Sequence, residues 1–268
     1  MLAQRCPTRR SSPRRGIART YEGPEAELDK KTYIVGLVTN RHVFEGKQRL
    51  KVRLNPTAAS PAIEFNLDLV DGGGTARWFG HAEPSIDVAT IPINFQVLLE
   101  HGIKVRAFLS DVHVAERAAA VQIGLTEGDG VFTLGFPLGL VGEERNFVIV
   151  RQGCIARIRD ALAGTSKEFL VDMSIFPGNS GGPVVSIPEL AAIEGTKPQN
   201  RAFLLGVVKG YLGYQDTAVS AQTGRLRVVF EENSGLAHVV PIEVVYRLMW
   251  KSGTASFRLL SAIEGNTT

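Results

Sequence analysis

The most regular pattern in the chain is an alternation of apolar and polar side chains with a period of two residues. In residues 62–70, AIEFNLDLV, the apolar positions fall on every second residue, as a half-buried strand requires. Gly, Pro, Asn and Asp interrupt the chain between this run and others of the same kind. The other predicted strands cover residues 32–39, 50–54, 87–93, 131–134, 147–158, 169–172, 183–187, 203–208, 226–230 and 237–240.

So many short strands predict an all-β fold rather than alternating βαβ units. Only two segments favour helix. The first covers residues 95–101. The second runs from Pro241 to Trp250, with proline at its first position and apolar residues at helical spacing. Residues 189–200 have the composition of a surface loop.

Composition is that of a globular protein, but the charge is unevenly spread. Hydrophobic residues make up 44% and charged residues 21% of the 268 positions. Residues 1–20 hold six arginines and no acid, so the rest has 30 − 6 = 24 basic residues against 27 acidic ones. A mildly acidic body offers no basic face for nucleic acid, and we expect the basic N-terminal segment, residues 1–25, to be disordered.

Cysteine content and hydropathy bear on the compartment. Cys6 and Cys154 are too few for a disulfide framework. The sequence shows neither a run of 18 apolar residues nor the apolar core of a secretion signal. We therefore expect a cytoplasmic protein without a membrane partner, although the Arg/Ser-rich start also weakly resembles an organellar transit peptide.

The segment that carries chemistry is FPGNSGGPVV, residues 176–185, in which Ser180 lies among glycines and prolines. A serine hydroxyl is a poor nucleophile until a base takes its proton and a third group orients that base. Among the five histidines, His42 follows an apolar strand where a turn begins, which is where a sheet presents a side chain. The contexts of His81, His101 and His113 are polar or loop-like and favour surface positions.

Asp87 is the candidate orienting group because it opens the strongly apolar run IDVATIPI, where an unpartnered carboxylate is costly. An imidazole N–H would be a suitable partner and would fix the tautomer of the base. A strand-capping aspartate is the structural alternative. Asp68 and Asp71 are the substitutes for Asp87.

Together, TNRHV, IDVA and PGNSGGPVV resemble the trypsin-like serine peptidases of the chymotrypsin fold, and especially the bacterial HtrA-like and V8-like branch. The resemblance covers roughly residues 31–250 and implies two six-stranded antiparallel barrels with a C-terminal helix. We expect the first barrel over residues 26–112, a linker over 113–124, the second barrel with the helix over 125–250, and a polar tail over 251–268. No PDZ domain is expected.

The resemblance implies that Ser180 attacks a peptide bond, with His42 as base and Asp87 orienting it. Gly178 lets the backbone turn so that its own N–H and that of Ser180 form an oxyanion hole. No cofactor or metal is expected, because no His/Cys/Asp cluster has ligand spacing. The partner is a peptide or protein substrate, and the oligomeric state is left open.

Departures from the family keep alternatives open. Residues 1–30 contain no SGF-like motif, which the family's first strand usually carries, so an inactive peptide-binding pseudo-peptidase is the second hypothesis. Asn179 and Val43 stand where the digestive enzymes have an aspartate and a cysteine, so no zymogen-style activation is implied. A G-x-S-x-G elbow of an α/β-hydrolase esterase is a remote alternative, since it needs a helix after the serine.

Substrate selection is expected to involve Ser174, six residues before the nucleophile, at the base of the specificity pocket. Walls would come from Lys209, Gly210 and Tyr211 and from the strand that holds His238. Without a carboxylate at the base, a small or aliphatic residue before the cut is the default. V8-like enzymes accept glutamate through a pocket histidine, so His238 keeps that specificity open, unless it points outward on its strand.

Overall fold

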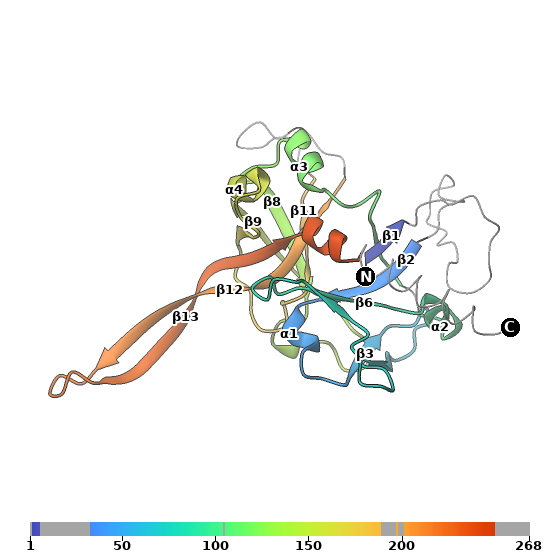
Figure 1. Cartoon of the computed structure of the whole chain (residues 1–268), viewed down its shortest axis with the longest axis horizontal. Coiled ribbons are helices and arrows are strands. Elements are labelled where there is room, and N and C mark those ends of the chain that lie inside the picture. The colour runs from blue at the N-terminus through green and yellow to red at the C-terminus, as the bar shows by residue number, and fades with distance from the viewer. Residues whose placement is uncertain (1, 6–32, 104, 189–196, 198–200, 250–268) are drawn as a thin grey trace. The chain divides into compact units, whose positions relative to one another are not determined.

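A computed structural model describes residues 2–5, 33–103, 105–188, 197 and 201–249 (Figure 1). The segments outside the described residues are most of the basic N-terminal segment, the tail and nearly all of the loop at residues 189–200. Cys6 and Trp250 are also outside them. The chain divides into two compact units. Unit 1 comprises residues 1–116, 141–148 and 242–268, and unit 2 comprises residues 117–140 and 149–241.

Unit 1 is built from a five-stranded sheet in the order β5-β6-β2-β1-β7 and a separate β3-β4 hairpin. The alternation predicted for AIEFNLDLV is present in β4, where half-buried and exposed residues alternate. The two helices of four to six residues are α1 (Arg41–Phe44) and α2 (Phe95–Glu100). The strands are β1 (Leu2–Arg5), β2 (Tyr33–Thr39), β3 (Arg49–Leu54), β4 (Ile63–Asp68), β5 (Phe79–Gly80), β6 (Ala89–Pro92) and β7 (Phe108–Leu109).

The first strand differs from the expectation of a disordered start. Leu2–Arg5 pair antiparallel with β2 and, through Leu2 and Ala3, parallel with β7. A strand edge such as that of β2 has unpaired backbone groups, and pairing with β1 satisfies them. In this unit the described strands make an open sheet and a hairpin rather than the predicted six-stranded barrel.

Two segments predicted to belong to the second barrel are part of unit 1. Residues 242–249 form the predicted C-terminal helix, and a Cβ at Gly36 of β2 would come within 2.9 Å of the Met249 side chain. The absent side chain of Gly36 thus makes room for this helix. The segment 141–148 is held to unit 1 by Arg53, whose guanidinium donates to the carbonyl oxygens of Gly142 (3.0 Å) and Glu143 (2.6 Å).

Unit 2 contains a closed six-stranded barrel in the order β10-β13-β12-β11-β8-β9 (Figure 1), which confirms the predicted second barrel. Each strand contributes a residue under 2% exposed to the core: Val131, Ile155, Val171, Val184, Val208 and Val239. Branched side chains therefore fill the interior. The strands are β8 (Gly130–Gly135), β9 (Ile149–Arg157), β10 (Phe169–Asp172), β11 (Pro183–Ser186), β12 (Leu204–Val219) and β13 (Leu226–Pro241).

Three short helices complete unit 2. They are α3 (Arg117–Ile123), the 3₁₀ turn η1 (Pro137–Gly139) and α4 (Arg159–Ala163). In the part of the chain that the structure describes, no helix has the length and apolar composition needed to cross a membrane.

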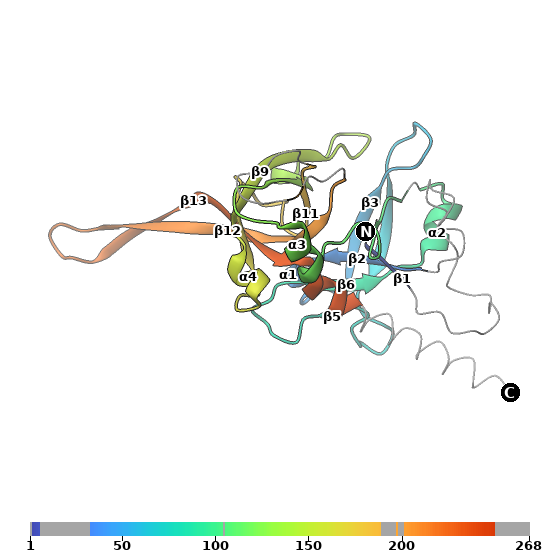
Figure 2. The same cartoon turned by 90° about the horizontal axis from the view of Figure 1, so that it is seen from above.

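The longest elements of unit 2 are β12 and β13, with 16 residues each, and they extend beyond the barrel as a two-stranded ribbon (Figures 1 and 2). We call residues 213–233 of this ribbon the arm. The sequence predicted strands only at 203–208, 226–230 and 237–240 within these two elements. Residues 221–230 are all exposed, so the arm has no buried face of its own to produce a clear alternation.

Glu127 anchors the start of α4 in unit 2. Its carboxylate accepts the backbone N–H groups of Ile158 (2.9 Å) and Arg159 (3.1 Å) and the guanidinium of Arg159 (2.7 Å). Burial alone would raise the pKa of Glu127, but the hydrogen bonds from these N–H groups lower it from the ordinary 4.5 to about 2.

A depressed carboxyl pKa stabilises the fold above the unfolded value, and this contribution is lost as the pH falls from about 4.5 to about 2. We therefore expect Glu127→Gln to lower the free energy of unfolding by about 1–2 kcal/mol at pH 7. The variant should also lose less stability than the wild type across that acidic window, as measured by urea unfolding. Glu144→Gln, at an exposed position, is the control, and equal acid-side losses in wild type and Glu127→Gln would contradict the prediction.

Candidate active site

The pairing of β2 with β6 brings two distant parts of unit 1 together. Thr39 at the end of β2 lies opposite Ala89 at the start of β6. The chain that leaves β2 therefore runs beside the chain that enters β6. This places His42, in the short helix α1, near Asp87, although 45 residues separate them in sequence.

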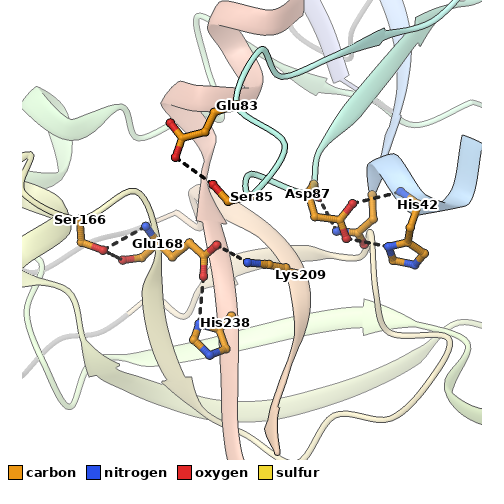
Figure 3. Close-up of polar contacts among 9 residues, drawn as sticks. His42, Glu83, Ser85, Asp87, Ser166, Glu168, Lys209 and His238 are labelled. Atoms are coloured by element: carbon orange, nitrogen blue, oxygen red, sulfur yellow. Dashed lines mark hydrogen bonds and ion pairs between the residues drawn. The ribbon is translucent and has the colours of Figure 1, made fainter. Parts of the chain in front are cut away.

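His42 and Asp87 make two hydrogen bonds (Figure 3). The ring Nδ1 of His42 lies 2.6 Å from Asp87 Oδ2, and the backbone N–H of His42 donates to Asp87 Oδ1 at 3.1 Å. The Asp87 side chain is 20% exposed and that of His42 is 58% exposed. One carboxylate thus holds both the ring and the backbone of the histidine, and the ring remains accessible.

Buried residues fix the two segments that carry this pair. Asn40, fully buried, donates from its side-chain amide to the carbonyl oxygen of Asp87 at 2.7 Å. Phe44, at the end of α1, is 1% exposed and packs against the Trp78 ring with centroids 5.8 Å apart. Between these anchors His42 has little freedom to move away from Asp87.

The substitutes for Asp87 have other roles. Asp68 pairs with Arg49 across the β3-β4 hairpin at 2.5 Å. Asp71 accepts the N–H groups of Gly73 (2.9 Å) and Thr75 (2.8 Å) in a turn. The choice of Asp87 as the partner of His42 is therefore consistent with where all three carboxylates lie.

Three other histidines bond to backbone atoms of nearby residues. The Nδ1 atoms of His81 and His113 accept the N–H groups of Glu83 (3.1 Å) and Leu109 (2.9 Å). His101 Nδ1 lies 2.8 Å from the carbonyl oxygen of Val97. His101 is exposed, whereas His81 and His113 are half-buried, so the expected surface positions hold fully only for His101.

Ser180 lies in unit 2 on a tight turn between β10 and β11, and the turn depends on Gly178. The φ of Gly178 is +98°, and a Cβ there would lie 2.2 Å from the carbonyl oxygen of Phe136. The neighbouring chain is bonded to the turn, since the Phe136 N–H donates to the Gly178 carbonyl oxygen at 3.2 Å. Only glycine fits this position.

Asn179 and Gly181 stabilise the turn from the inside. Asn179 is fully buried, and its side-chain oxygen accepts the Phe176 N–H at 3.0 Å. The Gly181 N–H donates to the Val208 carbonyl oxygen of β12 at 2.9 Å. Among the described residues the N–H groups of Gly178 and Ser180 donate no hydrogen bond, so both donors are available to another acceptor.

The element after the serine excludes the esterase alternative. A nucleophile elbow needs a helix directly after the serine. Here residues 183–186 form strand β11, which pairs with β8 and β12. The G-x-S-x-G match is therefore not the elbow of an α/β-hydrolase.

Two of the residues expected to select the substrate, Lys209 and His238, contact Glu168, which the sequence did not predict. Glu168 Oε1 lies 2.6 Å from Lys209 Nζ, and Glu168 Oε2 lies 3.0 Å from His238 Nδ1 (Figure 3). All three side chains are about one-fifth to one-third exposed. His238 lies between the buried residues Ala237 and Val239, so its side chain points out of the barrel, which was the structural alternative for this histidine.

The remaining predicted specificity residues lie near this cluster or beside the serine turn. Gly210 pairs with His238 across the sheet, at a shift in the strand register. The Tyr211 hydroxyl donates to Glu231 at 2.8 Å, and this bond raises the pKa of Tyr211. Ser174 is exposed between the buried residues Met173 and Ile175.

The structure thus places His42 beside Asp87 in unit 1, and it places Gly178 and Ser180 on one tight turn in unit 2. Across the described ranges, no group of three or more His, Cys, Asp or Glu side chains is arranged to hold a metal ion. Cys154 is a free, half-buried thiol, and burial raises its pKa.

A comparison with protein-family models matches residues 30–191 to the trypsin-like peptidase domain. The match spans more than half of the chain and includes His42, Asp87 and Ser180. The chain belongs to the trypsin-like peptidase family. No curated protein matches the sequence.

Sequence reasoning missed the supporting residues of this trypsin-like domain. Glu168 is two residues before Leu170, which pairs with His238, so the β10-β13 register brings Glu168 to the same face. That register cannot be read from either segment alone. Asn40 gave a weak signal, because it is a polar residue between an apolar strand and a turn.

We expect Gly178→Ala to destabilise the trypsin-like domain by about 1–3 kcal/mol from the positive φ alone, with the clash against Phe136 adding to this. The matched control is Gly210→Ala, because a Cβ at Gly210 meets nothing within 4 Å. Thermal and urea unfolding measure both variants. Equal stability losses in the two variants would show that the turn does not depend on Gly178.

Proposed function

We propose that this trypsin-like domain is a serine endopeptidase that cleaves peptide bonds through an acyl-enzyme. The observation that carries the proposal is the 2.6 Å contact between His42 Nδ1 and Asp87 Oδ2, in a chain whose family match also includes Ser180. A carboxylate at Nδ1 is what a histidine needs to serve as a general base through its other ring nitrogen.

In the proposed mechanism the His42 ring donates its Nδ1–H to Asp87, which leaves Nε2 as the proton acceptor. The second bond of Asp87, from the His42 backbone N–H, limits rotation of the carboxylate. His42 takes the proton of Ser180 as the serine attacks the carbonyl carbon, and it returns that proton to the leaving amine. Water then hydrolyses the acyl-enzyme by the same route.

The oxyanion of the tetrahedral intermediate would be bound by the N–H groups of Gly178 and Ser180. Their lack of other acceptors among the described residues supports this role. Each such donor is worth about 3 kcal/mol of transition-state stabilisation in serine hydrolases. A fixed turn is needed because donors that reorganise during the reaction would lose this advantage.

The edge of β12 around Lys209–Tyr211 is proposed to pair with the substrate backbone as an added strand. Near this edge, the Glu168 carboxylate already contacts both Lys209 and His238. A carboxylate of the substrate would have to compete with Glu168 for these two groups. We therefore favour a small or aliphatic residue before the scissile bond over glutamate.

The finer placement in the bacterial HtrA-like and V8-like branch rests on sequence alone. The segments GDGVFTLGFPLGL, VIVRQGCIARI and GLAHVVPIEVV carry that resemblance. Of these, residues 128–140 overlap β8 and its following turn, and residues 148–158 overlap β9. The branch remains part of the proposal.

A catalytically inactive, peptide-binding pseudo-peptidase is the competing hypothesis. It differs in one property, the reactivity of Ser180. A binding module needs only the β12 edge and its side chains, whereas an enzyme needs a deprotonated serine oxygen beside its oxyanion donors. A reagent that reports serine nucleophilicity therefore separates the two.

We expect a fluorophosphonate probe to label the wild-type chain at Ser180, as located by mass spectrometry. Ser180→Ala should abolish labelling, and His42→Ala and Asp87→Asn should reduce labelling and peptide hydrolysis by about 10⁴-fold or more. Ser85→Ala removes an exposed serine and should change neither. If the folded wild type, verified by circular dichroism, stays unlabelled, the pseudo-peptidase hypothesis replaces the enzyme.

Cleavage of a peptide library tests the specificity. The wild type should prefer small or aliphatic residues before the cut. Glu168→Gln removes the carboxylate that contacts Lys209 and His238, so cleavage after Asp or Glu should rise about tenfold relative to aliphatic residues, a difference of roughly 1.4 kcal/mol. Glu144→Gln is the control. A wild-type preference for glutamate would overturn this assignment.

A further inference from the structure

One edge of β12 is unpaired over most of the length of the strand. β12 pairs with β13 on one side, but with β11 on the other side only through residues 204–207. Among the described residues, no strand pairs with that second side of residues 210–219, which we call the open edge of β12. Alternate residues of an edge strand direct their backbone N–H and C=O groups outward, and another chain can pair with these groups.

The open edge begins beside the serine turn. The Val208 N–H donates to the Gly182 carbonyl oxygen, and the Val208 carbonyl oxygen accepts the Gly181 N–H, both at 2.9 Å. The side of β12 that lies opposite β13 therefore faces the turn at Val208 and continues along the arm. The substrate strand proposed at residues 209–211 does not reach the end of this edge, because β12 continues to Val219.

Hydrogen bonds at the base of the arm fix it as a continuation of the barrel. The Glu231 carboxylate accepts the Tyr211 hydroxyl (2.8 Å) and the Gln215 side-chain amide (3.1 Å). The Asn233 side-chain amide donates to the carbonyl oxygen of Ile175, a buried residue just before the serine turn, at 2.5 Å. These bonds limit bending of the arm where it leaves the barrel.

The two edges of the arm differ in how well they are protected against pairing. Natural edge strands avoid pairing through charged side chains, proline or bulges. On β13, which pairs with β10 only through residues 236–239, the arm carries Arg227, Glu231 and Glu232. On β12, residues 213–219 read GYQDTAV, with one charged residue and no proline. The open edge of β12 is therefore the less protected of the two.

The side chains beside the open edge indicate what an added strand would contain. Tyr214 and Asp216 share one face of the arm with Phe230, which lies opposite Asp216. Tyr214 is 58% and Phe230 is 54% exposed, so this face offers apolar area. Among the described residues, the Asp216 carboxylate makes no ion pair, and its Oδ1 accepts the Thr217 N–H at 3.1 Å. The face suits apolar side chains with a lysine or arginine beside Asp216.

We propose that the open edge of β12 binds the extended chain of a protein substrate as an added antiparallel strand, far from the scissile bond. This inference rests on the proposed peptidase function. Antiparallel pairing is the more stable kind, and it places the residues before the cut along the arm. A third strand also stabilises a ribbon that is marginal with two. The ten residues of the open edge span roughly 33 Å, so the substrate class is an unfolded or extended protein segment.

The test measures binding to the full-length Ser180→Ala chain by fluorescence anisotropy. The probes are labelled peptides with one central alanine for the cut, preceded by either about four or about ten residues of alternating valine and lysine. The longer peptide should bind at least tenfold more tightly, because only it reaches along the arm. The same extension placed after the alanine should add little. Equal affinity of the short peptide and the peptide lengthened before the alanine overturns the proposal.

Backbone pairing is tested by N-methylation of the added residues, which removes their N–H donors and keeps their side chains. The longer peptide should then bind no more tightly than the short one. An unchanged affinity would show that charge or apolar contact alone binds the peptide, and would overturn the added strand.

Proline substitutions in the arm test which edge is used. Of the neighbours Thr217 and Ala218, one directs its N–H to the open edge, and proline there should weaken binding of the longer peptide at least tenfold. Val229→Pro and Val228→Pro are the matched controls, because these residues lie directly opposite on β13. Opposite residues of an antiparallel pair lose equivalent bonds, so the cost to the ribbon is the same. Equal weakening by a variant and its opposite partner contradicts binding at β12.

This inference and the proposed function fail separately. Binding to Ser180→Ala does not require a reactive serine, so the length dependence can hold even where the fluorophosphonate probe does not label the wild type. Labelling of Ser180 without any length dependence would keep the peptidase and remove the added strand. With both in place, kcat/KM of the wild type should rise with peptide length by the same factor as the affinity.

Discussion

The proposed chemistry depends on one carboxylate that binds one residue twice. Asp87 accepts the ring Nδ1 and the backbone N–H of His42, so it fixes both the direction of the imidazole and the start of α1. Either bond alone would leave a rotation free. Both bonds can form because the β2-β6 pairing ends at Thr39 and Ala89. His42 comes shortly after Thr39 and Asp87 shortly before Ala89, so the two residues lie just beyond that last pair. Loss of that register by one position would separate the pair.

The serine in unit 2 is positioned differently, by backbone conformation rather than by charge. Gly178 adopts a positive φ against Phe136, and the buried Asn179 closes the turn on Phe176. In the digestive relatives an aspartate at the position of Asn179 pairs with a newly cut N-terminus. Here the amide oxygen accepts a local N–H instead. The turn therefore has a stabilising bond that needs no cleavage of the chain.

How far the sequence predicts the structure depends on whether an element has a buried face. The second barrel was predictable because alternating branched residues such as Val131 and Val239 mark its interior. β1 and most of the arm were not, since their pairing partners lie elsewhere and exposed strands need no alternation. The contact between His42 and Asp87 was predictable because each stands next to an apolar strand, His42 where a turn begins and Asp87 where an unpartnered carboxylate is costly. Glu168 was missed because only the β10-β13 register relates it to His238.

β12 and β13 contribute to three parts of unit 2 at increasing distance from the barrel core. β12 and β13 provide Val208 and Val239 to the interior, then Lys209 and His238 to the charged cluster, and finally Val228 and Phe230 to the arm. Val228 is ten residues from His238 along β13, which corresponds to roughly 33 Å of extended chain. Effects of substitutions so far apart are usually additive. Substitutions in the charged cluster and in the arm can therefore be made and measured independently, although both lie on the same hairpin.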